Sequence, residues 1–153
     1  PRRTSSAASD VYKRQGLYEK SMIGDGYPKR GNYEYIKTKT EEVFYDPKIA
    51  TKEIVDEVFE SVNDREKLIR TLSLAKSAIR HNMADDLPEM VTKTLIIWGK
   101  DDFVTPPNVA KDFHSLLPNS NLVWIDKCGH APMMEHPVHF NKLMEKWLFD
   151  NNL

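Results

Sequence analysis

The sequence predicts an α/β fold with parallel strands in its last third and helices before them. Two short apolar runs, "TLIIW" at 94–98 and "NLVWI" at 121–125, are typical of strands buried on both faces of a parallel sheet. One amphipathic segment lies between these runs at 106–117, and another follows them at 137–150. The order strand, helix, strand, helix implies parallel strands joined by a right-handed crossover.

The first 32 residues show no apolar period that would predict a packed element. The stretch "PRRTSSAASDVYKRQ", residues 1–15, has no initiator Met and is small, polar and basic. It resembles the adapter-derived tails found at the edges of metagenomic reading frames, so we expect a non-native or disordered tail; a native disordered arm is the alternative. Residues 16–32 are rich in glycine and predict a loop, without a dinucleotide or phosphate-binding fingerprint. We expect that the chain is truncated at its start.

Residues 33–90 predict a helical region of three amphipathic segments. The first, "YEYIKTKTEEVFY" at 33–45, has the weakest period. The second covers 51–62 with Thr51 as its N-cap, and the third covers 64–83 with Asp64 in the capping position. The apolar stripes of these two helices are Ile54, Val55, Val58, Phe59 and Val62, and then Leu68, Leu72, Ala75 and Ile79. Core packing is the expected role of most of them.

Residues 91–153 predict the strand and helix units of the sheet. Prolines occupy the first turn of the helix at 106–117, where a missing amide proton costs nothing. The strand residues Trp98 and Trp124 are expected in the core. The apolar faces of the two helices are Val109, Phe113, Leu116 and Leu117, and then Phe140, Leu143, Met144, Trp147 and Leu148.

Composition excludes several classes of function. The 153 residues carry a net charge of −1, which suggests neither a nucleic-acid footprint nor a polybasic membrane signal. No apolar run is long enough to span a bilayer, and the N-terminus has no apolar segment like that of a signal peptide. The single cysteine, Cys128, rules out an internal disulfide and fits a reducing compartment. We therefore expect a soluble, cytoplasmic protein with no membrane or nucleic-acid partner.

Three polar residues follow the two predicted strands. Asp101 and Asp102 lie in "GKDDFVTP" after the first strand, and His130 lies in "DKCGHAPM" after the second. Because ligands bind beyond the carboxyl ends of parallel strands, these residues are expected at one functional edge. A carboxylate beside a histidine fixes the ring tautomer and stabilises the imidazolium, and the other ring nitrogen then accepts a proton from a nucleophile.

At this point the chain resembles the α/β-hydrolase family. "WGKDD" at 98–102 is similar to the family's acid loop, and "CGH" at 128–130 is similar to its histidine loop. The resemblance implies that Asp102 is the catalytic acid, that His130 is the base and that Asp101 shapes the loop. It also implies that 33–90 is the helical cap, with "GLYE" at Gly16 at its entry, and that 91–153 is the C-terminal portion of the hydrolase core. Within the family the contexts are most similar to hydrolases of meta-cleavage products, which cut carbon–carbon bonds.

One part of the family pattern is missing. The nucleophile elbow G-x-S-x-G would precede the cap, and none of the six glycines belongs to such a pentapeptide. The first strands of the family's sheet would also lie upstream. The resemblance therefore implies an acid and a base without their nucleophile, a serine or less often an aspartate. We expect this chain alone to be catalytically inactive and marginally folded, because two strands leave a sheet edge bare.

Two other kinds of site, a cysteine–histidine dyad and a metal site, can be considered for residues in the histidine loop and after it. A Cys128–His130 dyad is conceivable, but a small buried cysteine is the better interpretation. His130, Glu135, His136 and His139 match no metal-binding spacing, so we expect no metal and no cofactor. The expected partner is a small organic substrate of the longer protein, an ester or a compound with a cleavable carbon–carbon bond, and a homo-oligomer remains open. The competing class is a non-catalytic interaction module or a degenerate hydrolase.

Overall fold

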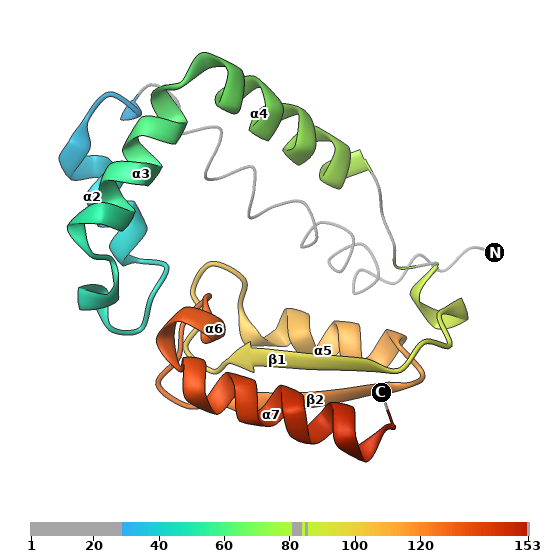
Figure 1. Ribbon diagram of the computed structural model, residues 1–153. Coiled ribbons are helices and arrows are strands. Elements are labelled where there is room, and N and C mark those ends of the chain that lie inside the picture. The colour runs from blue at the N-terminus through green and yellow to red at the C-terminus, as the bar shows by residue number, and fades with distance from the viewer. Residues whose placement is uncertain (1–28, 81–83, 85, 153) are drawn as a thin grey trace.

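The computed structural model describes residues 29–80, 84 and 86–152 (Figure 1). The predictions for residues 1–15 and for 16–28 lie outside the described residues. In chain order the elements are α2 (Tyr33–Glu41), η2 (Pro47–Ile49), α3 (Lys52–Asn63), α4 (Arg65–Arg80), η3 (Leu87–Glu89), β1 (Thr94–Gly99), α5 (Pro107–Leu116), β2 (Ser120–Ile125), α6 (Pro132–Glu135) and α7 (Pro137–Asp150). None of these described helices is long and apolar enough to cross a membrane.

The predicted N-caps of α3 and α4 are confirmed. The hydroxyl of Thr51 accepts a hydrogen bond from the amide of Ile54 at 3.5 Å, and Asp64 Oδ1 accepts one from the amide of Lys67 at 2.9 Å. These side chains satisfy amide protons that have no partner in the first helical turn. Val55 is the buried centre of the α3 stripe, at 2% exposure. The side chains of residues 75–80 in α4, including two of its predicted stripe positions, lie outside those described.

Helix α2 is shorter than the sequence predicted. The prediction extended it over residues 33–45, whereas the structure ends it at Glu41. The following residues make tight turns, with the amide of Phe44 bonded to the carbonyl of Glu41 at 3.2 Å. Beyond the turn, segment 43–45 bonds to the loop after β2 and to α6 instead of continuing the helix. A tertiary contact therefore overrides the local helical pattern.

Strands β1 and β2 form a two-stranded parallel sheet, as predicted. The register pairs Thr94 with Ser120 and Gly99 with Ile125, so both strands end at the same edge. Helix α5 packs on one face of the sheet and α7 lies against the other (Figure 1). The core on the α5 side consists of Leu87, Ile96, Ala110 and Leu117, against which Trp98, Phe113, Leu116, Leu122 and Trp124 pack.

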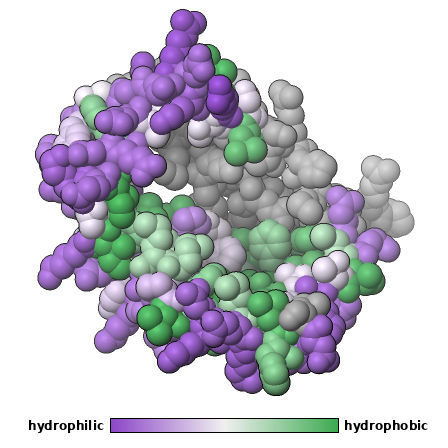
Figure 2. Space-filling model, in the orientation of Figure 1, coloured by the Kyte–Doolittle hydropathy of each residue, from purple (hydrophilic) through white to green (hydrophobic). Residues whose placement is uncertain are grey.

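The strands are less buried than their apolar composition predicted. Ile96 and Ile125 are buried, but the other apolar residues of β1 are only half-buried. On the α7 face a groove of about 510 Å³ remains open. It is lined by Lys93, Thr94, Leu95, Ile97, Phe140, Met144, Trp147 and Leu148. Figure 2 shows the difference between the regions, since hydrophobic residues gather around the sheet and α7 whereas α3 and α4 present mostly hydrophilic ones.

Candidate active site

The loops that leave β1 and β2 are joined through their backbones. The amide of Lys100 donates to the carbonyl of Ile125 at 2.9 Å, which continues the sheet by one step. The amide of Asp101 then donates to the carbonyl of Cys128 at 3.0 Å. These bonds hold the acid loop and the histidine loop side by side at the carboxyl edge of the sheet, where parallel strands place their ligands.

Gly99 lets the two loops approach each other. A Cβ atom at this position would lie 2.1 Å from the carbonyl oxygen of Gly129 and 2.3 Å from that of Cys128. Both neighbours are backbone atoms and cannot rotate away. The last residue of β1 must therefore be a glycine for this spacing of the loops.

The close approach brings together the two residues that the sequence singled out. His130 Nδ1 and Asp102 Oδ2 are 2.9 Å apart, which is the distance of a direct hydrogen bond. The other carboxylate oxygen of Asp102 accepts bonds from the amides of Val104 at 2.9 Å and Thr105 at 2.8 Å. The side chain of Asp102 is 3% exposed. Asp102 is therefore a buried, fully bonded carboxylate with one oxygen directed at the histidine.

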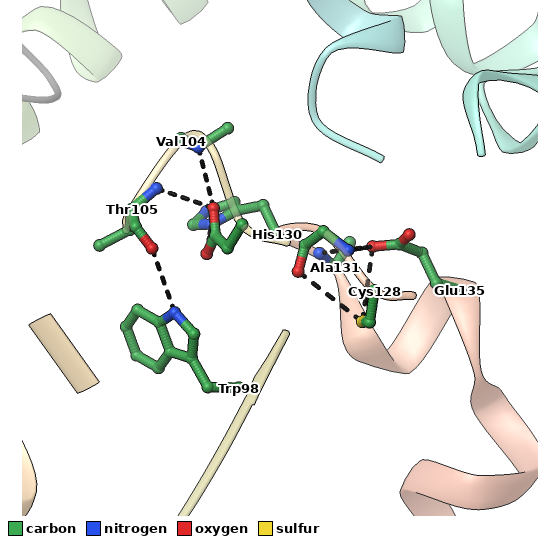
Figure 3. Close-up of polar contacts among 9 residues, drawn as sticks. Trp98, Val104, Thr105, Cys128, His130, Ala131 and Glu135 are labelled. Atoms are coloured by element: carbon green, nitrogen blue, oxygen red, sulfur yellow. Dashed lines mark hydrogen bonds and ion pairs between the residues drawn. The ribbon is translucent and has the colours of Figure 1, made fainter. Parts of the chain in front are cut away.

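A tryptophan braces the loop that carries this carboxylate. The indole Nε1 of Trp98 donates to the carbonyl of Thr105 at 3.1 Å (Figure 3). Trp98 belongs to β1 and packs against the α5-side core, so this hydrogen bond connects the loop to the sheet and its core. The prediction that Trp98 is a core residue holds, and the polar end of its ring has a second role.

The electrostatics of His130 suit a proton acceptor. The hydrogen bond to Asp102 raises the pKa of His130; partial burial opposes the shift, and the charges of Asp102 and Glu135 add to it. The imidazole side chain is 41% exposed. Because Nδ1 faces Asp102, the ring's Nε2 is left to exchange a proton with a reacting group.

Cys128, in contrast, lies in a position unsuited to a nucleophile. It is fully buried at the base of the histidine loop, with Sγ 3.7 Å from both the Gly129 carbonyl and Glu135 Oε1. Burial, together with the charge of Glu135, raises the pKa of the thiol to about 12. The thiol is therefore protonated at neutral pH, which disfavours a Cys128–His130 dyad.

The remaining polar residues that the sequence singled out lie apart from a common site. Asp101 contributes its backbone amide to the loop pairing, in keeping with the shaping role expected of it. His136 uses Nε2–H to bond the carbonyl of Lys127 at 2.9 Å, and His139 is exposed on α7. Within the described ranges, no three histidine, cysteine or acidic side chains are grouped so that they could hold a metal ion.

Two features of the site were not foreseen. The amide of His130 donates to the carbonyl of Val43, at 2.8 Å, so the segment that follows α2 contacts the histidine loop directly. Glu135, for which the sequence suggests only a metal-ligand role, accepts hydrogen bonds from the backbone around His130. No sequence pattern identifies such bonds, because one partner is a backbone amide that every residue except proline carries.

Comparison with known proteins places this geometry in context. A family model described as alpha/beta hydrolase fold matches residues 12–137. The 2-hydroxy-6-oxononadienedioate/2-hydroxy-6-oxononatrienedioate hydrolase of a Pseudomonas species is 30% identical over 136 residues, which cover 88% of this chain and 44% of that protein. Monoacylglycerol lipase abhd6-A of Xenopus laevis is 30% identical over 77 residues, which cover 50% of this chain and 23% of the lipase.

A solved structure is more similar in sequence. MGS-MChE2, an alpha/beta hydrolase enzyme from the metagenome of sediments of the Mar Chica lagoon in Morocco, matches with a TM-score of 0.61 and 65% identity. The match covers 67% of this chain and 47% of that one. The chain thus spans less than half of the length of each of these three relatives.

Proposed function

Because the chain belongs to the alpha/beta hydrolase fold family, we propose that Asp102 and His130 are the acid and the base of a hydrolase catalytic triad. The family resemblance of "WGKDD" and "CGH" is confirmed at the level of family and fold. The observation that carries the proposal is the 2.9 Å contact between His130 Nδ1 and the buried Asp102, with the histidine partly open to solvent.

In this proposal His130 transfers one proton in each direction. Its Nε2 accepts the proton of the nucleophile as the nucleophile's oxygen bonds to a substrate carbonyl carbon. It then returns the proton to the leaving group when the bond from the carbonyl carbon to that group breaks. Asp102 keeps Nδ1 protonated and stabilises the imidazolium between these steps. Nε2 then accepts a proton from a water molecule as the water oxygen bonds to the acyl carbon, and it returns that proton to the nucleophile's oxygen when the bond between nucleophile and acyl group breaks.

The nucleophile is the part of the triad that this sequence does not display. None of the 153 residues forms a G-x-S-x-G elbow. We therefore expect the isolated chain to be inactive, and we expect activity when the acid and base are combined with a nucleophile elbow of the same family. Residual catalysis by positioned groups other than the nucleophile would be small.

The proposed substrate is a small organic molecule with an electrophilic carbonyl group. The Pseudomonas relative is named as a hydrolase of an oxononadienedioate, and the Xenopus relative as a lipase of monoacylglycerol. Cleavage beside a ketone and cleavage of an ester both begin with attack on a carbonyl carbon, so the same acid and base serve either reaction. An ester or a carbon–carbon bond next to a carbonyl is accordingly the proposed target.

The proposal can be tested in a chimera with MGS-MChE2. The part of that enzyme matched by this chain would be replaced by the corresponding residues of this chain, which is favoured by their 65% identity. Hydrolysis of p-nitrophenyl esters and of a 2-hydroxy-6-oxo-dienoate would be followed by absorbance. We expect the chimera to hydrolyse at least one of them, and His130→Ala to abolish the activity.

The matched control is His139→Ala, which removes an exposed imidazole nine residues away on α7. A chimera that folds, by its thermal transition, yet hydrolyses none of the substrates would contradict the proposal. So would a His130→Ala chimera as active as the His139→Ala control. Either result would favour a non-catalytic interaction module.

A further inference from the structure

A single carboxylate, that of Glu135, gathers hydrogen bonds from two separate parts of the chain. Its Oε1 accepts from the amide of Gly129 at 2.8 Å and from the amide of Ala131 at 3.3 Å. Its Oε2 accepts from the amide of Tyr45 at 2.7 Å. Figure 3 shows Glu135 reaching from α6 toward Ala131 and Cys128.

These bonds enclose His130. Gly129 and Ala131 are its two neighbours in the chain, so Oε1 fixes the backbone immediately before and after the histidine. The amide of His130 itself is bonded to the carbonyl of Val43 at 2.8 Å. All three consecutive amides of the loop therefore have defined partners. With the backbone fixed in this way, the direction in which the His130 side chain leaves the backbone is fixed as well.

The same carboxylate connects the loop to the region before α3. Segment 43–45 contributes the Val43 carbonyl and the Tyr45 amide, and it lies so close that a Cβ at Gly129 would be 2.6 Å from the Val43 oxygen. Position 129 therefore requires glycine because a side chain would collide with this segment. Its backbone dihedral angles do not require glycine, since no glycine among the described residues has a positive φ.

Only a carboxylate fits this position. Both of its oxygens face donors: two amides and the Cys128 thiol on Oε1, and the Tyr45 amide on Oε2. A glutamine at residue 135 would offer one acceptor oxygen, and its NH₂ group would face a donor on the other side. An aspartate would be shorter by one methylene and could not span the Tyr45 and Gly129 amides.

We propose that Glu135 is a positioning residue, which fixes the backbone on both sides of His130 and ties it to segment 43–45 so that the imidazole meets Asp102. This inference rests on the proposed function, because it assigns Glu135 a role in the acid–base pair. It extends that function by connecting the histidine loop to the predicted cap region, so that a displacement of segment 43–45 also displaces the catalytic base.

The first test uses NMR of the full 153-residue chain. Couplings through hydrogen bonds, from the amide nitrogens of Gly129 and Tyr45 to the carboxyl carbon of Glu135, would report the bonds in the unaltered protein. The Nδ1 proton of His130 would report its bond to Asp102 as a downfield signal. Both sets of signals are expected in the wild-type chain, and absence of the Glu135 couplings while the α5 and α7 amides give the signals of folded helices overturns the inference without the need of a variant.

The second test compares Glu135→Gln with Glu145→Gln, an identical change at an exposed position on α7. We expect Glu135→Gln to weaken or abolish the His130 Nδ1 signal and to speed hydrogen exchange at Tyr45, with the α5 and α7 signals unchanged. Glu145→Gln should leave all of these as in wild type. A His130 signal in Glu135→Gln that matches that of the control would overturn the inference, because a residue that only stabilises the fold would act on the whole domain.

The two proposals fail in different ways. If the His130 Nδ1 signal is present, disappears in Asp102→Asn and is unaffected by Glu135→Gln, the positioning role is wrong and the acid–base pair stands. If the wild-type chain has the Glu135 couplings but no Nδ1 signal that depends on Asp102, the acid–base pair itself is wrong.

Discussion

Replacement of Gly99 by alanine is expected to separate the acid from the base. The added Cβ would lie 2.1 Å from the carbonyl oxygen of Gly129, whereas an ordinary contact needs 3.4 Å or more. Because the obstructing atoms are backbone, one loop must move by about 1 Å, a distance that cannot be absorbed by side-chain rotation. The hydrogen bond between the Asp101 amide and the Cys128 carbonyl would be lost with it.

The magnitude follows from two effects. Overpacking of this kind costs about 1–3 kcal/mol of unfolding free energy. A catalytic group displaced by about 1 Å costs on the order of 10²-fold in rate. We therefore expect Gly99→Ala to lower the midpoint of urea unfolding by about 1 M, given a typical slope for a small protein. In the MGS-MChE2 chimera we expect kcat to fall on the order of 100-fold.

Gly31→Ala is the matched control. A Cβ at Gly31 would meet no atom within 4 Å, so its effect on the unfolding free energy is expected within about 0.5 kcal/mol. Tryptophan fluorescence against urea would measure both variants. Equal unfolding midpoints for Gly99→Ala and Gly31→Ala, with an unchanged rate in the chimera, would refute the claim that Gly99 sets the distance between the loops.

Four further predictions concern the titratable groups. In the chimera, Asp102→Asn should lower kcat by about four orders of magnitude, the loss seen for the same change in serine protease triads, while a loss of less than about tenfold would contradict the orienting role. Since Asp102 raises the pKa of His130, the pH–rate profile should rise with an apparent pKa above the ordinary histidine value of about 6.5. In Asp102→Asn the ascending part of the profile should move to lower pH. A histidine pKa that is raised on folding stabilises the folded state fully at pH values below the unfolded pKa, and this stabilisation is lost as pH rises through the folded pKa. The difference in unfolding free energy between wild type and Asp102→Asn, measured by urea unfolding, should therefore be larger at pH 5.5 than at pH 8.5. Cys128, whose pKa is raised to about 12, should resist iodoacetamide at pH 8 in the folded chain and react once urea unfolds it, and stoichiometric labelling of the folded chain would refute its burial.

The β-α-β-α unit and the proximity of Asp102 to His130 could be predicted because each depends on local patterns. The apolar runs identify the strands, and parallel strands that end at one edge place Asp102 and His130 at that edge. The caps at Thr51 and Asp64 were predictable for the same reason, since the side chain that begins the helix lies beside it in sequence.

The features that were missed depend on contacts between distant residues. Helix α2 ends early because Val43 bonds to His130 and Tyr45 bonds to Glu135 of α6, about ninety positions further along the chain. The role of Glu135 and the short helix α6 arise from the same packing. The burial of β1 was overestimated because an apolar run shows what a strand can bury, whereas its exposure depends on the neighbours that cover it.

The most direct test of the acid–base pair is the NMR titration of His130 in the 153-residue chain and in its Asp102→Asn variant. Ring carbon and nitrogen shifts would be followed from pH 4 to pH 10. The structure predicts a pKa above the ordinary value of about 6.5 in the wild-type chain and a lower pKa in the variant, because the hydrogen bond to Asp102 is the largest cause of the shift. The same pKa for His130 in both proteins would contradict the account.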